Sequence, residues 1–216
     1  MDDYTRPDYR HMALVTVDVQ NDFSLPGSAL EIKGTMEVLP NIVSLLKLFR
    51  AMGKPIVHIV RFYKADGSNV DLVRRRWVQS GVSAGRPGTD GAELVSALKP
   101  NERRLDAVGL LKGKVQELAS NEHVIYKPRW GAFYHTPLEK LLKGKRINTL
   151  AFTGCNFPNC PRTSIYEASE RDFRIIIVRD AISGIYEKGV EELKRIGCEI
   201  MLAQELENSL KSLQGS

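Results

Sequence analysis

The chain has 216 residues, of which 43% are hydrophobic and 26% charged, and its 31 Lys and Arg outnumber its 26 Asp and Glu. This composition excludes a disordered or low-complexity chain, and the length favours a single domain over residues 1–216 that needs neither disulfide nor metal to build its core. The polar N-terminus is unlike a signal peptide, and no apolar run approaches the ~20 residues of a membrane span, so we expect a cytoplasmic protein without membrane association.

Short apolar runs rich in β-branched residues alternate with segments of helical periodicity. The expected strands are residues 13–19, 55–61, 123–127, 148–154, 174–180 and 198–202. The expected helices are residues 38–52, 137–143, 162–173 and 188–196. Strands that are apolar on both faces are typical of buried parallel sheets, and the alternation predicts an open, doubly wound α/β sheet with helices on both faces.

The segment from about residue 66 to about residue 122 departs from this alternation. It is rich in Arg, Gly and Ser, and short helical pieces are expected around Leu94 and Val115. We predict an irregular excursion over the sheet edge or over the site. Its Arg runs are not interleaved with aromatic residues, which favours a solvated helix over a nucleic-acid partner.

Ligands of such sheets bind beyond the carboxyl ends of the strands. The residues expected there are Asp18, Arg61, Lys127, Cys160 and Asp180. An aspartate that closes an apolar strand is costly to bury unless it is paired, although Asp18 also suits a turn or a helix cap. Lys127 precedes Trp130 and Phe133, so it is either partly desolvated at the mouth of the sheet or an ordinary solvated lysine.

Cys160 precedes Pro161, a residue typical of the first position of a helix, so we expect the cysteine at the helix N-cap. The free N–H groups there favour a thiolate and can receive an oxyanion. A buried structural role fits Cys198 better, and Cys155 is left open. With an aspartate and a lysine nearby, Cys160 would form a nucleophilic triad in which the acid takes the proton and the lysine lowers the thiol pKa.

Several motifs occur in order at residues 17–23, 88–94, 127–133, 154–160 and 178–181. Together they resemble the isochorismatase-like cysteine hydrolase superfamily, which includes nicotinamidases, N-carbamoylsarcosine amidohydrolases and ureidoacrylate amidohydrolases, over roughly residues 12–206. The resemblance implies a three-layer α/β/α fold with a six-stranded, mostly parallel sheet. It also implies a catalytic triad of Asp18, Lys127 and Cys160, and an assembly of two or more copies.

The resemblance further implies an oxyanion hole of backbone N–H groups near the cysteine and a non-proline cis peptide just before it. We expect that peptide at Asn156–Phe157, with a cheaper cis bond at Pro158 as the alternative. Nicotinamidases hold a metal with an aspartate and several histidines after the second strand, where this chain has only His58. We interpret His58 as a hydrogen-bonded core residue, expect no metal or cofactor, and disfavour a nicotinamidase.

The expected activity is hydrolysis of a C–N bond in a small amide, ureido or carbamoyl compound through a thioester. The alternatives are a vinyl-ether hydrolase of the isochorismatase type and a binding protein without turnover. The predicted substrate-binding or oxyanion residues are Phe23, Arg61, Trp130, Phe133, Asn156, Phe157 and Asn159. The aromatic residues indicate an apolar substrate body, and Arg61, Arg129 or Arg162 would bind a carboxylate unless they pair with acids of the protein.

Overall fold

A computed structural model describes residues 3–213, so the two ends of the expected domain lie outside the described residues. The strands are β1 (Met12–Val17), β2 (Ile56–Val60), β3 (Gln116–Ala119), β4 (Glu122–Tyr126), β5 (Thr149–Gly154), β6 (Arg174–Ile182) and β7 (Glu199–Met201). The helices are α1 (Asn21–Ser24), α2 (Thr35–Ala51), α3 (Leu72–Gln79), α4 (Ala107–Leu111), α5 (Leu138–Gly144), α6 (Cys160–Ser169), α7 (Glu187–Arg195) and α8 (Ala203–Ser212).

The strands form one sheet in the order β3-β4-β2-β1-β5-β6-β7, in which only the β3–β4 pair is antiparallel. The chain therefore winds outward in both directions from β1, and the strand order reverses between β1 and β5. In doubly wound sheets, ligands bind at this switch point. The mostly parallel α/β architecture is as predicted, and it brings the carboxyl ends of β1, β4 and β5 to one edge.

The sheet has seven strands rather than the predicted six. The added strand β3 lies within the excursion and pairs with β4 at the edge of the sheet. Of its four residues only Leu118 is buried, so it has no apolar run of the kind that marked the inner strands. A short edge strand of this type is hard to detect because its exposed positions are polar.

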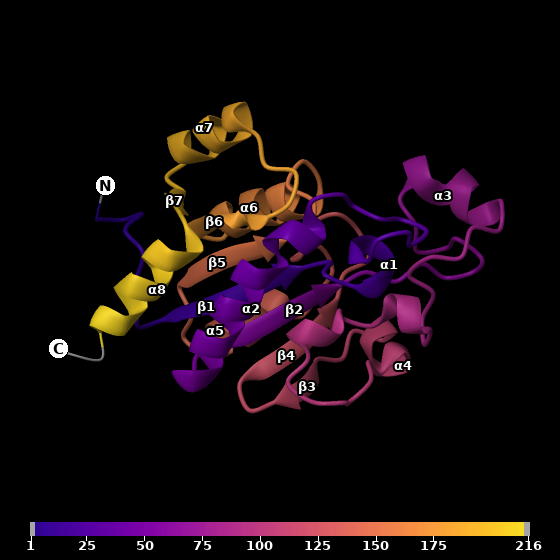
Figure 1. The fold of residues 1–216 in the computed structure, drawn as a ribbon, viewed down its shortest axis with the longest axis horizontal. Coiled ribbons are helices and arrows are strands. Elements are labelled where there is room, and N and C mark those ends of the chain that lie inside the picture. Colours follow the sequence, from indigo (N-terminus) through magenta and orange to yellow (C-terminus); the bar gives the residue numbers. More distant parts are fainter. Residues whose placement is uncertain (1–2, 214–216) are drawn as a thin grey trace.

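Helices cover both faces of the sheet (Figure 1), as the alternation predicted. Met12 and Leu14 of β1 face a core that contains residues of α2 and α8. Ala13, Val15 and Val17 face the opposite core, which includes residues of α5, α6 and α7. This alternation along one buried strand is the period-2 pattern of a sheet that is covered on both sides.

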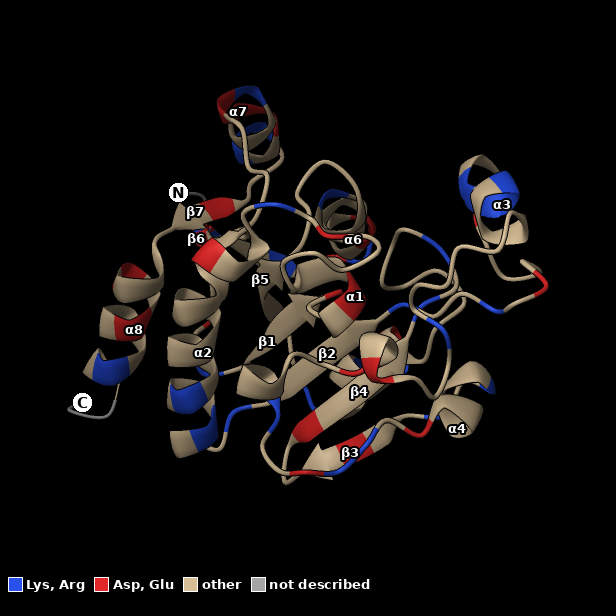
Figure 2. Ribbon diagram, turned by 45° about the vertical axis from the view of Figure 1, so that its right-hand side comes forward, with Lys and Arg blue, Asp and Glu red and all other residues tan. Residues whose placement is uncertain are grey.

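The excursion contains α3, two single-turn 3₁₀ segments around Leu94 (Asp90–Ala92 and Ser96–Leu98), α4 and β3. The helical piece expected around Val115 lies earlier, at α4, because Gly113, with φ +78°, ends that helix. Helix α3 projects from the body at the end of the molecule that also holds α1, and it carries much of the basic charge there (Figure 2).

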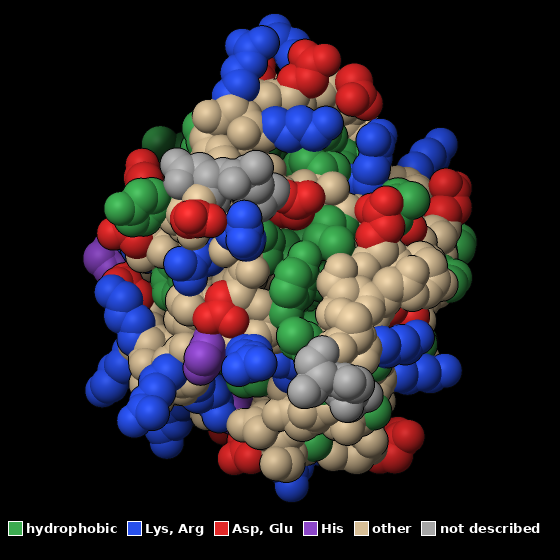
Figure 3. Space-filling model, turned by 90° about the vertical axis from the view of Figure 1, so that its left-hand side faces the viewer, with side chains coloured by type: hydrophobic (Ala, Val, Ile, Leu, Met, Phe, Trp, Pro, Cys, Tyr) green, Lys and Arg blue, Asp and Glu red, His purple; other side chains and the backbone are tan. Residues whose placement is uncertain are grey.

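The opposite end of the molecule has Lys and Arg interspersed with Asp and Glu, as an ordinary solvated surface does (Figure 3). No helix within residues 3–213 is long and apolar enough to cross a membrane.

Candidate active site

Asp18 follows β1 directly, and its φ of +56° lies in the left-handed region, which aspartate tolerates better than most residues. Its N–H donates to the carbonyl of Ile59 at 2.9 Å, which fixes it between β1 and β2. Its carboxylate is buried, with Oδ2 3.0 Å from Lys127 Nζ. The other oxygen, Oδ1, is buried without a hydrogen-bond partner among the described residues.

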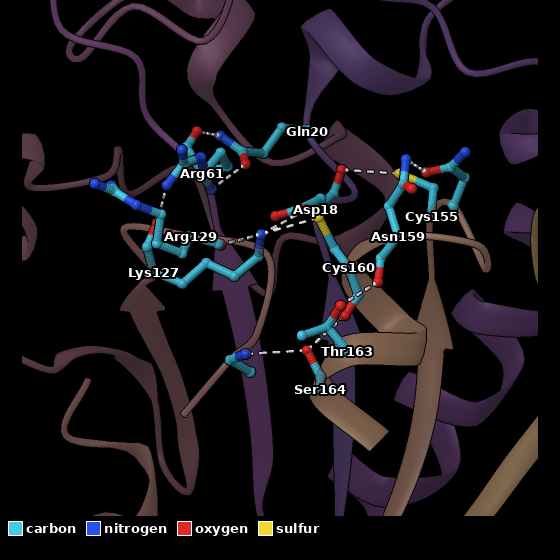
Figure 4. Close-up of polar contacts among 12 residues, drawn as sticks. Asp18, Gln20, Arg61, Lys127, Arg129, Cys155, Asn159, Cys160, Thr163 and Ser164 are labelled. Atoms are coloured by element: carbon cyan, nitrogen blue, oxygen red, sulfur yellow. Dashed lines mark hydrogen bonds and ion pairs between the residues drawn. The ribbon is translucent and has the colours of Figure 1, made fainter. Parts of the chain in front are cut away.

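Lys127 follows β4 and its side chain is fully buried. Besides the ion pair with Asp18, its ammonium donates to Cys160 Sγ and to the carbonyl of Arg129, both at 3.1 Å. Figure 4 shows the ammonium directed toward the Asp18 carboxylate and the Cys160 sulfur. Burial would lower the lysine pKa, but the charge of Asp18 and the neighbouring Cys160 outweigh it, and the pKa is raised above its ordinary value. Lys127 is therefore a fixed cation.

Cys160 is the first residue of α6, and Asn159 is the N-cap, so the cysteine lies one position later than predicted. Pro161 occupies the second position, which is acceptable because the N–H groups of the first turn have no intrahelical acceptor. The structure thus brings together the three side chains predicted as a triad, at the carboxyl edge of the sheet.

The expectation that the lysine and the helix start lower the Cys160 pKa is not met. Burial, followed by the charge of Asp18, raises the pKa of this thiol to about 12, and Lys127 only partly opposes the effect. The unliganded site therefore holds a neutral thiol beside an Asp–Lys ion pair. Cys155 is also buried, its pKa is raised well above the ordinary value, and it donates to the Asp18 carbonyl at 3.1 Å.

The turn before α6 is tightly built. Gly154, with φ +117°, lies so close to the backbone of Val17 that a side chain would collide with it. The cis peptide is at Cys155–Asn156, one bond earlier than predicted, and the N–H of Phe157 donates to the carbonyl of Ser183 at 2.8 Å. The N–H groups of Asn156 and Cys160 donate to no described residue, so both are available to an oxyanion.

Arg61 pairs with an acid of the protein, which is the alternative to its predicted role as a ligand of a substrate anion. Its guanidinium is buried and donates to the carbonyls of Lys127 and Asn69 at 3.0 and 3.2 Å and to Asp71 Oδ2 at 3.0 Å. The backbone N–H of Arg61 donates to Gln20 Oε1 at 2.7 Å, and Gln20 Nε2 donates to the backbone carbonyl of Arg61 at 3.0 Å. Asp71 belongs to the excursion, so the partner of Arg61 was not evident from the strand ends.

The predicted pocket residues divide into two groups. Phe133 and Phe157 are core residues, since Phe133 packs against Phe173 with ring centres 5.7 Å apart, and Phe157 packs against Tyr186 at 5.4 Å. Phe23 is nearly buried in a small cluster that includes Tyr63 and Cys155. The remaining three are partly buried: Trp130, Asn156 and Asn159.

Asn159 Nδ2 donates to Asn156 Oδ1 at 3.3 Å, which keeps the two amides together beside the cysteine. Trp130 lines a hollow of about 520 Å³ together with Asp71, Arg129 and Thr163. Asp180, the remaining strand-end residue, lies away from the triad and accepts a hydrogen bond from the N–H of Ala203 at the start of α8.

Two residues that join α6 to the loop after Lys127 were missed. Ser164, fully buried, donates to the Cys160 carbonyl at 2.7 Å and accepts from the Ala132 N–H at 3.0 Å. Glu167 accepts from the Phe133 N–H at 2.8 Å and fills the space that a side chain on Gly131 would need. Their i+4 and i+7 spacing from Cys160 on one helix face is the signal that could have found them.

His58 is the hydrogen-bonded core residue that was predicted. Its Nδ1 lies 2.8 Å from Thr16 Oγ1, and its Nε2 lies 2.8 Å from Glu122 Oε1, which also pairs with Arg50. Both ring nitrogens are occupied and Arg61 follows three residues later, so the residues after β2 do not fit a metal ion. No group of three or more His, Cys, Asp or Glu within residues 3–213 is placed to hold one.

Comparisons with known proteins identify relatives of the whole fold. The family model described as the isochorismatase domain matches residues 12–109 and 106–205. A probable inactive nicotinamidase of Arabidopsis thaliana is 29% identical over 195 residues, covering 88% of this chain and 91% of the relative. A ureidoacrylate amidohydrolase of Methylobacterium radiotolerans is 29% identical over 196 residues, covering 84% of this chain and 69% of the relative. The crystal structure of an isochorismatase family protein from Desulfovibrio vulgaris superposes with a TM-score of 0.79 at 32% identity, covering 93% of this chain and 98% of that one.

Proposed function

The chain belongs to the isochorismatase family, and from this membership we propose that it is a cysteine hydrolase that cleaves a C–N bond in a small amide, ureido or carbamoyl compound. The observation that carries the proposal is the position of Lys127 Nζ, 3.0 Å from Asp18 Oδ2 and 3.1 Å from Cys160 Sγ. A nucleophile, an acid–base group and a fixed cation in direct contact are the components of covalent acyl transfer.

In the first half-reaction, Cys160 Sγ forms a bond to the substrate carbonyl carbon while its proton moves to the Asp18 carboxylate. The thiol pKa of about 12 means that this proton leaves as the bond forms and not beforehand. Negative charge develops on the carbonyl oxygen, where the N–H groups of Cys160 and Asn156 can receive it. The C–N bond then breaks, the Asp18 proton passes to the departing nitrogen, and a thioester remains.

In the second half-reaction, water attacks the thioester carbonyl and gives a proton to Asp18. The C–S bond breaks, the acid product leaves, and the Cys160 sulfur recovers its proton from Asp18. Lys127 keeps its charge throughout. Its ammonium stabilises the negative charge of the Asp18 carboxylate before the attack and that of the Cys160 sulfur when the C–S bond breaks. Atoms and charges balance over the cycle, and only water is consumed besides the substrate.

A binding protein without turnover is the second candidate. The relative in Arabidopsis thaliana is described as a probable inactive nicotinamidase, and in this chain prolines stand on both sides of Cys160, at Pro158 and Pro161. A vinyl-ether hydrolase on the same fold is a further candidate, which would use Asp18 and leave Cys160 idle. These candidates differ in what they require of Cys160.

The test is a screen of small amides, ureido and carbamoyl compounds for ammonia release by the wild type, Cys160→Ala and Cys198→Ala. The proposal predicts turnover in the wild type and in Cys198→Ala, because Cys198 lies in the core away from the triad, and none in Cys160→Ala. Full turnover in Cys160→Ala would favour the acid-only chemistry. Binding of a screened compound to the wild type without ammonia release would favour the binding protein.

A further inference from the structure

The arginines that the sequence placed near the site are occupied by groups of the protein. Arg61 is held by Asp71 and by backbone carbonyls. Arg129 donates to the carbonyls of Asn69 and Pro128 at 3.0 and 2.8 Å. Arg162 pairs with Glu192 and with the hydroxyl of Tyr186. Each of these three guanidinium groups has already committed N–H donors to groups of the protein, so none can offer all of its donors to a substrate anion.

Arg74, on α3 of the excursion, has different surroundings. Its guanidinium lies 4.8 Å from the ring centre of Trp130 and 5.9 Å from that of Tyr63, and its Nη1 donates to the Tyr63 hydroxyl at 2.6 Å. No carboxylate in the described part of the chain forms an ion pair with it. Asp71, one turn earlier on the chain, directs its carboxylate to Arg61 instead. Two aromatic rings thus orient a partly buried guanidinium that keeps most of its donors.

The two rings that hold Arg74 belong to segments that adjoin the triad. Tyr63 packs in one buried cluster with Phe23 and Cys155, and the Cys155 thiol donates to the backbone of Asp18. Trp130 follows Arg129, whose carbonyl accepts from Lys127 Nζ. Arg74 is therefore attached on two sides to segments that contact Asp18 and Lys127 directly.

The charge of this region favours an anion. Asp18 and Lys127 neutralise each other, and the carboxylates of Asp22 and Asp71 are bound to the Gly85 N–H and to Arg61. Three guanidinium groups lie around Tyr63, Trp130 and Asp71, those of Arg61, Arg74 and Arg129. Asp71 is the described carboxylate that pairs with Arg61 and Arg129, and Arg74 pairs with none within residues 3–213. A partly buried cation without a paired anion is favoured by a ligand that supplies the opposite charge.

We propose that Arg74 is a specificity-determining residue that binds a carboxylate, or a comparable anionic group, on the amide or ureido substrate. This inference rests on the proposed function for the class of substrate and for the site at which it binds. The excursion then contributes to the site itself, by placing a cation beside the aromatic walls. Arg74 takes the role that the sequence analysis had assigned to Arg61, Arg129 or Arg162.

The test measures binding without chemistry, in the Cys160→Ala background. N-carbamoylglycine and its neutral isostere N-carbamoylglycinamide are titrated into the protein by calorimetry. We expect the anion to bind at least about tenfold more tightly, as one charge-assisted contact provides. Adding Arg74→Met should abolish that preference, and Arg74→Lys should restore part of it. The preference should shrink as salt is raised.

The matched control is Arg76→Met, on the same helix, where the side chain is exposed and has no ion pair within residues 3–213. It should keep the preference. Tyr63→Phe, which removes only the hydroxyl that orients Arg74, should weaken it, and this variant preserves the ring packing if Arg74→Met disturbs α3. Equal affinity for both probes, no binding of the anion, or an equal loss in Arg76→Met would overturn the inference. Failure of the proposed chemistry alone would leave the preference in place, because this assay needs no turnover.

Discussion

The buried ammonium of Lys127 lies 3.0 Å from the buried Asp18 carboxylate, and the two residues come from strands that are not neighbours in the sheet. Strand β2 separates them, so the ion pair spans the carboxyl edge from β4 to β1. Each charge is tolerated because the other is present, and both act, after burial, on the proton affinity of the Cys160 thiol.

Asp18→Asn is expected to have opposite effects on two rates. Loss of the carboxylate removes the acid–base group, so turnover should fall by about 10²–10⁴-fold. The same change removes a charge that raises the Cys160 pKa, so alkylation of Cys160 by iodoacetamide at pH 8 should become faster. Peptide mass spectrometry against time measures the alkylation. A decrease in both rates would indicate general damage to the site and contradict this role.

Lys127→Met should destabilise the protein by about 3–5 kcal/mol, because it leaves the Asp18 charge buried without a partner. The double variant Asp18→Asn with Lys127→Met should recover most of that loss, since no unpaired charge remains. Urea denaturation of the two single variants and the double variant gives the coupling energy. Additive losses would show that the two side chains do not depend on each other.

Ser164→Ala tests the connection between α6 and the loop after Lys127. The change leaves the Ala132 N–H without its acceptor and frees the Cys160 carbonyl, at a cost of about 1–3 kcal/mol. We expect kcat to fall about tenfold or more with little change in KM, because the misplaced group is the nucleophile and not the binding wall. Ser169→Ala, at the other end of the same helix, is the control for a general loss of helix stability. A change confined to KM would argue against a positioning role.

Glu122→Gln tests the buried network behind the site. Burial would raise the Glu122 pKa, but hydrogen bonds from Arg50 and His58 outweigh it and hold it at about 2. A carboxylate whose pKa is lower in the folded protein stabilises the fold fully at a pH above its pKa in the unfolded chain, which is near 4.5. This contribution is lost as the pH falls towards 2. The shift corresponds to about 3 kcal/mol. The free energy of unfolding of the variant, measured by urea denaturation, should therefore be lower at pH 7 and depend less on pH between 5 and 2. A pH dependence equal to that of the wild type would contradict the stabilising role of the Glu122 carboxylate.

Much of the candidate site at the carboxyl edge of the sheet was predictable from the sequence. Asp18 and Lys127 are polar residues at the ends of apolar strands, and Cys160 precedes a proline that marks a helix start. Polar groups in those places need partners, and a doubly wound sheet brings its strand ends together. The parallel sheet followed from the same apolar runs.

The errors arose where a residue depends on a partner from the excursion or on burial that one sequence cannot reveal. Arg61 pairs with Asp71, whose position depends on how residues 66–122 fold. Phe133 and Phe157 lie within the motifs but belong to the core, because an aromatic residue beside a site and one beneath it have the same local pattern. The Cys160 pKa was expected to fall, since the burial and the charge of Asp18 that raise it are tertiary effects.

The most direct test of the central claim is to trap the acyl-enzyme. Wild-type protein is mixed with a substrate from the ammonia-release screen and quenched in acid within milliseconds. Its mass is then measured by mass spectrometry, on the intact protein and on its peptides. We predict a mass increase equal to the acyl fragment, located on Cys160, formed in Cys198→Ala and missing in Cys160→Ala. Turnover of that substrate with no acyl group on Cys160, or with an acyl group on another residue, would contradict the account.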